Sequence, residues 1–500
     1  MYSSALVLVR KRGGFLSGSS CRNFVLRRTS VAMDSEAMVE PEISLLSLPD
    51  DALLAVLAFL SPRELFACRV ACRRLRDLCL HQHLWRAASV ESEGVLRAAL
   101  ALAPCIGTIA KVPMEALEPL VSASACTVSG LELSVYGEKS VALALALLSR
   151  FSAVSSGLRL TKLTLHLSSC LPNATASLIF QALYAFNGLQ DLTFDNDLDS
   201  AVLGELEVLP SLRKLILTSS STGAFFNLML RTHFATLEDV DISYLKTDVP
   251  WSSLASLSRL RSLTCYQGEG LSHLAALPIA HLDISIEEDD ACAPGALEFL
   301  SKASHLRTVK LSATRNVIKA PLLALGKSLS APTLESLDVN GDYDFRWAGV
   351  ATMVTPVLVL SKFLSLKSLI LTINNEPLPE DLLQAVSPTS SPCLTMLELH
   401  VKETLELWFN DSESETSLCL HEAVHGPFVL DLFVRNPRLH LRVVEWYRYY
   451  CKDCSWCWWG CHARLHREAV VSLSSHSLGA GCPLDCYQVI KSGGRPHAAG

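Results

Sequence analysis

One repeated pattern runs through most of this 500-residue chain and limits what it can fold into. A Leu-x-x-Leu-x-Leu signature, with other apolar residues at some positions, begins ten times between residues 160 and 394, at intervals of 19 to 32 residues. The last two signature positions alternate with single intervening residues, as in a half-buried β-strand. The intervals carry apolar residues with helical spacing, which predicts alternating strands and helices. The copies begin at Leu160, Leu189, Leu212, Leu237, Leu260, Ile279, Leu306, Leu334, Leu366 and Leu394.

This period is that of leucine-rich repeats. Each strand-plus-helix unit of such an array leaves an apolar side bare, and stacking of neighbours buries it in a continuous core. We therefore predict an α/β fold in which residues 128–450 form a leucine-rich-repeat solenoid, with a parallel sheet on its concave face and helices outside. The Asn that usually follows the signature is matched only at Asn374. Other groups must satisfy the backbone there, so we expect an irregular horseshoe.

A different pattern occupies residues 48 to 85, before the repeats. Leu48-Pro49 fits just outside a helix start, and Ser61-Pro62 supplies an N-cap and a first helical residue for a second short helix. About forty residues in short helices cannot bury so many leucines alone, so this segment requires a partner surface. Its main anchor positions are Leu48, Pro49, Leu53, Leu57, Leu60, Leu65, Cys68, Cys72, Leu78 and Trp85.

In these positions the segment resembles the F-box, and residues 45–90 are assigned to it. Ala71 and Leu75 depart from the usual Val and aromatic residue but remain apolar. The resemblance implies that the ten anchors form, or directly support, a docking surface for a Skp-family adaptor, and through it for a cullin–RING ubiquitin ligase. The alternative is a helical hairpin that only caps the following domain.

The residue between the last two signature positions of each copy is expected to project onto the concave sheet. Four of these ten residues are acidic and one is basic, which favours a target protein with a surface rich in Lys and Arg. The charged members are Asp241, Asp283, Lys310, Asp338 and Glu398.

By resemblance to F-box proteins with leucine-rich repeats, the chain is expected to be a non-catalytic subunit that recognises the substrate of a cullin–RING E3 ligase. The alternative is a zinc-dependent hydrolase using His421, Glu422 and His425, whose spacing places two metal ligands and a base on one helical face. Gly426-Pro427 follows at once and would end that helix. A helix continuing past His425 favours the hydrolase, and a turn there removes it. A third reading is an adaptor-bound scaffold without a degraded target.

Composition and the two ends of the chain bear on location. The net charge of −7 argues against a general nucleic-acid binder, and no membrane span is predicted. Seventeen cysteines without a secretory signal indicate free thiols in a reducing compartment, so we expect a cytoplasmic or nuclear protein. Residues 1–32 are rich in Arg and Ser and lack acids, which is typical of a mitochondrial transit peptide, but a disordered leader over 1–44 is preferred. Residues 91–127 are expected to be a helical connector, and 471–500 a disordered tail.

Residues 451–470 are rich in Cys and Trp and form a predicted cap on the last repeat. The spacing of the cysteines allows a tetrahedral zinc site, or an iron–sulfur cluster, although His462 replaces the Pro usual in the latter. The alternative is a cap without metal, in which the thiols pack as small apolar residues among the tryptophans. The four candidate ligands are Cys451, Cys454, Cys457 and Cys461.

Elemental analysis of the purified chain distinguishes these two forms of the cap. We favour the cap without metal and expect no stoichiometric zinc after expression in metal-replete medium. About one zinc per chain would instead identify a structural site. A chelator would then lower the stability of the last repeats, because metal binding and folding are coupled.

Overall fold

The structure of the chain is a computed structural model, and most of the residues that it describes lie between 45 and 475. The residues that it describes are 45–152 without 125, 160–196 without 169–170, 185 and 187, 210–218, 223–245, 249–287, 293–314, 318–342, 359–374, 380–402, 424–445, 470–475 and 487–488. The chain divides into two compact units, Met1–Leu53 and Leu54–Gly500, and each is described by itself.

Short helices dominate the first part of the described chain. The first unit contains a 3-10 turn and the start of α1, where Asp50 and Asp51 place negative charge at the positive end of the helix dipole. The second unit continues with three more helices. The bounds are η1 (Leu45–Ser47), α1 (Asp50–Leu57), α2 (Pro62–Cys68), α3 (Arg73–Leu78) and α4 (Gln82–Arg86).

A sheet of sixteen described strands follows, and its strands pair in the order of the chain. Every pair from β1 to β14 is parallel, β14 pairs with β15 antiparallel, and β15 pairs with β16 parallel. The strands are β1 (Ser89–Val90), β2 (Cys105–Ile109), β3 (Thr127–Val135), β4 (Lys162–Leu167), β5 (Asp191–Asn196), β6 (Lys214–Leu217), β7 (Asp239–Ile242), β8 (Ser262–Tyr266), β9 (His281–Ile286), β10 (Thr308–Thr314), β11 (Ser336–Asp342), β12 (Ser368–Asn374), β13 (Met396–Lys402), β14 (His440–Glu445), β15 (Val470–Ser474) and β16 (Tyr487–Gln488).

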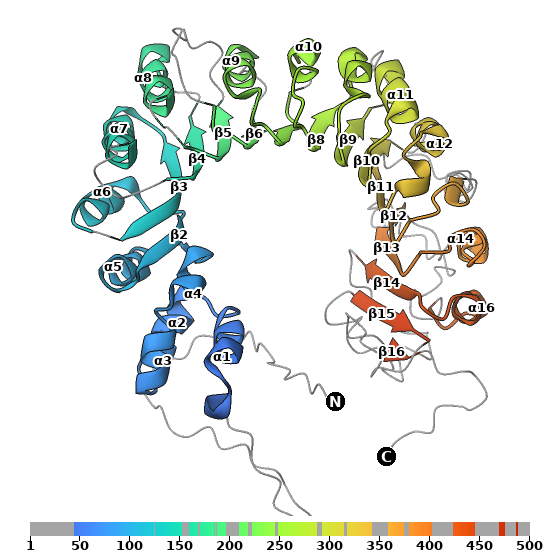
Figure 1. Cartoon of the computed structure of the whole chain (residues 1–500), viewed down its shortest axis with the longest axis horizontal. Helices are drawn as coiled ribbons and strands as arrows, with labels where there is room; N and C mark the ends of the chain where they lie inside the picture. The colour runs from blue at the N-terminus through green and yellow to red at the C-terminus, as the bar shows by residue number, and fades with distance from the viewer. Residues whose placement is uncertain are drawn as a thin grey trace, which may run out of the picture. The chain divides into compact units, whose positions relative to one another are not determined.

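Helices connect these strands and cover one face of the sheet in the second unit (Figure 1). The other face, called here the open face, carries none of the helices that the structure describes. The predicted fold class, a helical region followed by a solenoid with a long parallel sheet and outer helices, is confirmed. The connecting elements are α5 (Glu93–Leu102), α6 (Met114–Ser122), α7 (Glu138–Ser152), α8 (Asn173–Tyr184), α9 (Gly223–His233), α10 (Trp251–Leu254), η3 (Glu269–Leu274), α11 (Ala293–Lys302), α12 (Lys319–Lys327), η4 (Ala331–Thr333), α14 (Glu380–Ala385) and α16 (Pro427–Arg435).

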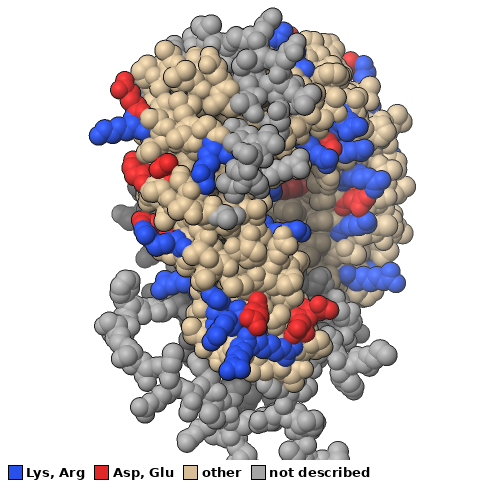
Figure 2. Space-filling view, turned by 60° about the vertical axis from the view of Figure 1, so that its left-hand side comes forward, with Lys and Arg blue, Asp and Glu red and all other residues tan. Residues whose placement is uncertain are grey.

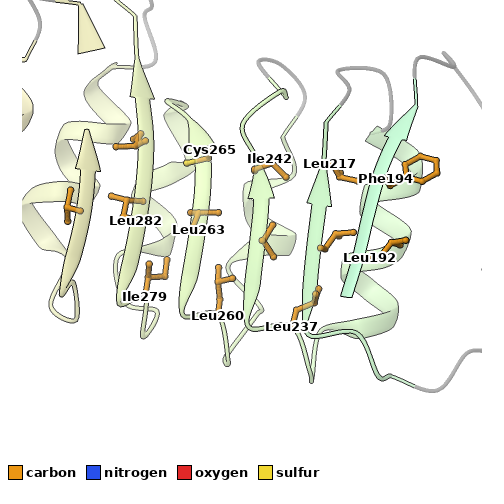
Figure 3. Close-up of a cluster of buried hydrophobic side chains, with 14 of the residues drawn as sticks. Leu192, Phe194, Leu217, Leu237, Ile242, Leu260, Leu263, Cys265, Ile279 and Leu282 are labelled. Atoms are coloured by element: carbon orange, nitrogen blue, oxygen red, sulfur yellow. The ribbon is translucent and has the colours of Figure 1, made fainter. Parts of the chain in front are cut away.

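The signature residues fill the space between the sheet and the helices. Residues at equivalent positions of successive strands are direct neighbours: Leu263 pairs with Leu282, and both are buried. Figure 3 shows such side chains from successive strands in rows within the buried layer. Three rings extend the layer between strand and helices, because Phe194 of β5 lies 5.3 Å from Phe180 of α8 and 4.7 Å from Phe225 of α9, between ring centroids. Buried contacts of this kind supply most of the stability of a solenoid.

Hydroxyl groups satisfy several backbone carbonyls where one unit meets the next. The Oγ of Ser211 donates to the carbonyl of Leu189, and the Oγ1 of Thr236 donates to Leu212, at 2.8 and 2.7 Å. The Oγ of Ser330 donates in the same way to Ala303, four units further along. Short polar side chains thus bridge neighbouring units in an array that has little of the usual Asn.

The sheet extends beyond both predicted boundaries of the repeats. The predicted helical connector 91–127 contains β2 as well as α5 and α6, and β1 already belongs to the sheet. The signature did not find β2, because its sequence CIGTI has too few apolar positions in the required register. The predicted disordered tail contains β15, whose Ser472 and Ser474 are buried. The serine-rich composition of this region indicated disorder, so the strand was not predicted.

Among the described residues, none of the helices has both the length and the apolar composition of a membrane-spanning segment.

His233 makes stability depend on pH. Burial lowers the pKa of its imidazole to about 4, and its Nδ1 accepts hydrogen bonds from the N–H groups of Ser211 and Leu212. The native ring is therefore neutral between pH 6.5 and 4, whereas the ring in the unfolded chain takes up a proton. The stability from this group is complete above pH 6.5 and is lost as pH falls toward 4, by up to about 3 kcal/mol.

Denaturant unfolding at several pH values tests this expectation. His233→Gln should have a smaller loss of unfolding free energy between pH 7 and 4 than the wild type. His281→Gln, at an exposed histidine, is the matched control and should keep the wild-type dependence. Equal pH dependence of all three proteins would contradict a buried neutral ring.

Candidate protein-interaction surfaces

The second helix of the F-box-like segment begins as its sequence predicts. Ser61 is the N-cap, Pro62 is the first helical residue, and the Oγ of Ser61 accepts a hydrogen bond from the N–H of Glu64. The Glu64 carboxylate accepts in return from the N–H of Ser61 at 2.8 Å. This reciprocal capping box fixes the direction in which the chain enters α2. Cys72 caps α3 similarly, with its Sγ accepting from the N–H of Leu75.

The predicted adaptor anchors differ in their exposure. Within the second unit, Trp85 is fully buried, its Nε1 donates to the carbonyl of Cys79 at 2.8 Å, and its ring lies 5.2 Å from that of Phe66. Such residues can only support a docking surface. The buried anchors are Leu53, Leu57, Leu65 and Trp85, the half-buried ones are Leu48, Leu60, Cys68, Cys72 and Leu78, and Pro49 is exposed.

The two most exposed large apolar residues described in segment 45–90 were not among the predicted anchors. Phe59 follows α1 and is 89% exposed, and Val70 follows α2 and is 85% exposed. Both lie off the stripes of buried leucines on which the sequence analysis relied. A large aromatic residue at the end of a short amphipathic helix is the signal that would have found Phe59.

The charges around these helices are mixed in sign. Arg63, Arg73 and Arg76 are exposed on α2 and α3, with Glu64 and Asp77 exposed beside them in the sequence. Figure 2 shows Lys and Arg side chains interspersed with carboxylates over the visible face. This arrangement does not form a uniform basic surface for an extended polyanion.

The second candidate surface is a row of side chains across the middle of the open face. Backbone pairing places its members side by side on successive strands, from β4 to β14. We call it the central row. It consists of Thr164, Thr193, Ile216, Asp241, Thr264, Asp283, Lys310, Asp338, Ile370, Glu398 and Arg442.

All five predicted target-binding residues belong to this row and are half-buried. Arg442 was not among the predicted residues, because it lies in the segment Leu439 to Val443, which follows the ten copies and matches the signature only in part. Glu132 of β3 also faces Thr164 in the same register. Val128, Leu131 and Leu133 also match the signature ahead of the ten copies, and Glu132 lies between the last two of these positions. The rule that found the other members of the row would therefore have included it.

Two acids of the row are already in ion pairs. Asp283 accepts from the Nζ of Lys310 at 2.9 Å, and this hydrogen bond raises the pKa of Lys310. Glu398 contacts His400 at 2.6 Å and accepts from Arg442 at 3.0 Å. The hydrogen bond with His400 is the largest cause that lowers the pKa of Glu398, whose side chain is only 12% exposed. Glu398 is therefore less available to a partner than its sequence position indicated.

The other two acids differ from these. In the described part of the chain, neither Asp241 nor Asp338 forms an ion pair within 4 Å. Burial raises the pKa of Asp338, while Lys310 and His400 oppose that effect. A half-buried carboxylate without an ion pair gains most from an incoming cation, because its desolvation has already occurred. Asp241 and Asp338 are thus the strongest acceptors of the row for a basic partner.

A cavity of about 740 Å³ lies beside the N-terminal strands of the sheet, where β2 and β3 end and α6 and α7 begin. Glu132 contributes to its wall and so joins it to the register of the central row. Val112 and Met114 provide apolar wall, and the 72% exposed Tyr136 provides an aromatic ring. The volume of the cavity lies in the range of small-ligand sites.

The hydrolase alternative meets a turn at the predicted position. His425 and Gly426 lie in a turn, Gly426 is the N-cap, and α16 starts at Pro427. No helix continues past His425, so the condition for the hydrolase fails. Burial lowers the pKa of His425. His421 and Glu422 lie outside the described residues, as do the four candidate cysteine ligands. Within the described ranges, no group of three or more His, Cys, Asp and Glu is arranged to hold a metal ion.

Comparison with known proteins identifies the helical segment. Residues 45–90 match the family model described as F-box-like, which covers the part of the chain assigned above to the F-box. No curated protein matches the chain. Among solved structures, the chain is similar to one titled "Crystal structure of Rad7 and Elc1 complex in yeast", with 12% identity, a TM-score of 0.37, and coverage of 72% of this chain and 84% of that chain. A likeness at this level defines neither fold nor function.

Proposed function

We propose that the chain is the non-catalytic substrate-recognition subunit of a cullin–RING ubiquitin ligase. The observation that supports this most is the F-box-like match of residues 45–90, followed directly by a solenoid with an open polar face. In this proposal the F-box-like segment docks a Skp-family adaptor, and the central row holds a target protein. The catalytic contribution is proximity, because target lysines are held at high effective concentration near the charged ubiquitin-conjugating enzyme.

The proposed target carries a surface rich in Lys and Arg. Asp241 and Asp338 support this, since each lacks an ion pair among the described residues and lies on the face that no described helix covers. Charge complementarity of this kind sets the orientation and rate of association more than its free energy. A scaffold that binds its partner without degradation uses the same surface. A cytoplasmic or nuclear location and the lack of a required cofactor belong to the same proposal.

Adaptor docking is tested by replacing Leu48 and Pro49 together with Ala. Apolar anchors dominate such interfaces, and the truncation of each costs roughly 2 kcal/mol of binding free energy. Recovery of the adaptor should therefore fall by roughly 100-fold or more. Leu102→Ala removes an exposed apolar side chain outside the F-box-like segment and is the control. Circular dichroism should show the sheet intact in both variants. Undiminished adaptor recovery by the double variant would refute the proposed docking.

Target binding is tested by Asp241→Lys combined with Asp338→Lys. Like charges would then face the basic target, and recovery of target proteins by quantitative mass spectrometry should fall about tenfold or more. The matched control reverses Asp381 and Asp431, which are exposed on α14 and α16. Adaptor recovery should stay at the wild-type level in both proteins. Unchanged target recovery by the row variant would move the binding surface elsewhere without affecting the adaptor assignment.

A further inference from the structure

A serine-rich turn follows α14 and is closed by its own hydroxyl groups. The Oγ of Ser387 lies 2.8 Å from the Oγ1 of Thr389 and 3.0 Å from the Oγ of Ser390, and it accepts from the N–H of Ser390. The Oγ of Ser390 donates in turn to the carbonyl of Ala385, the last residue of α14. The position of the Ser387 hydroxyl is therefore tied to the end of that helix.

The sequence of this turn contains two Ser-Pro dipeptides, which are the acceptor sequence of proline-directed protein kinases. Ser391, before Pro392, is 4% exposed and so is shielded from an enzyme. Ser387 is half-buried, and the two residues after it, Pro388 and Thr389, are exposed. The structure thus separates one accessible acceptor from one inaccessible acceptor within five residues.

A guanidinium group binds the end of the helix just before Ser387. Arg435, at the end of α16, donates to the carbonyls of Leu383, Gln384 and Val386, at 2.9, 2.5 and 3.0 Å. These carbonyls lie at the C-terminal end of α14, where the helix leaves its acceptors unsatisfied. Arg435 therefore joins α14 to α16, together with the Nδ2 of Asn436, which also donates to the carbonyl of Val386. The guanidinium contacts the carbonyl of the residue that precedes Ser387.

We propose that Ser387 is a phosphorylation site for a proline-directed kinase and that its phosphate draws Arg435 away from α14. In the reaction the Ser387 oxygen attacks the γ-phosphorus of a nucleoside triphosphate. A bond forms between Oγ and phosphorus, the bond to the β,γ-bridging oxygen breaks, nucleoside diphosphate leaves, and the hydroxyl proton passes to the base of the kinase.

The phosphate changes this site in two ways. It brings a charge of about −1.5 to −2 to the C-terminal end of a helix, where negative charge is unfavourable. It also offers Arg435 an acceptor that is itself charged and can be bound through two hydrogen bonds, whereas the three carbonyls that Arg435 now contacts are neutral. α14 then loses its three hydrogen bonds from Arg435 and keeps those from Ser390 and Asn436, and the packing of α14 on α16 loosens.

Kinase treatment of the full chain tests the proposal. A purified proline-directed kinase with magnesium and ATP should place a phosphate on Ser387, as mapped by mass spectrometry. Hydrogen exchange at the amides of residues 380–386 should become about tenfold faster after phosphorylation, and phosphatase treatment should reverse it. Ser391→Ala should be phosphorylated as the wild type is, and Ser387→Ala should not acquire the faster exchange.

Arg435→Gln separates the modification from its effect. Its amides in α14 should already exchange faster than in the wild type, and phosphorylation of Ser387 should add little further increase. A chain that takes no phosphate on Ser387 would overturn the site. A chain phosphorylated on Ser387 with unchanged exchange in α14 would overturn the role of Arg435. Neither result depends on an adaptor or a target.

Discussion

The structure depends on the burial of an apolar side that each strand-plus-helix unit cannot cover by itself. In-register pairing places Leu263 beside Leu282 and Leu282 beside Val309. Each inner unit therefore buries the apolar side of one neighbour and has its own buried by the other. Such an array folds by contacts between neighbours, and its ends need a different cover. At the N-terminal end the cover comes from the helical segment, because Trp85 and Leu84 of α4 belong to the same buried cluster as Ile106 of β2.

The helical segment lies close to β2 because Gly107 has no side chain. A Cβ at Gly107 of β2 would lie 2.5 Å from the carbonyl oxygen of Arg86 and 2.8 Å from that of Ala88. Glycine therefore allows β2 to approach the link between α4 and β1, and the Sγ of Cys105 reaches the carbonyl of Gln82. The end of the F-box-like segment is thus packed onto the sheet, with no long flexible linker between them.

The sequence predicted the solenoid of strands and helices well because burial acts on every second residue of each strand. Leu, Ile and Val at signature positions could be located by spacing alone, and alternation then placed Asp241 and Asp338 on the open face. Partners across strands could not be predicted in this way, since an ion pair such as that of Glu398 with Arg442 depends on the register of two distant segments. The strands β2 and β15 were not predicted, because packing against neighbouring strands determines them and they lack the leucine spacing of the signature.

The contrast between periodic buried positions and contacts that depend on tertiary structure also explains why only part of each interaction surface could be predicted from the sequence. An amphipathic stripe identifies residues such as Leu65 and Trp85, but the physical reason for the stripe is intramolecular burial. Residues that remain exposed, such as Phe59, carry no periodic signal because no neighbour in the chain constrains them. On the open face the register adds information, since it shows which acids already pair with a basic side chain on a neighbouring strand. Asp241 and Asp338, which have no ion pair within the described part of the chain, are consequently better guides to a partner than the net charge of the row.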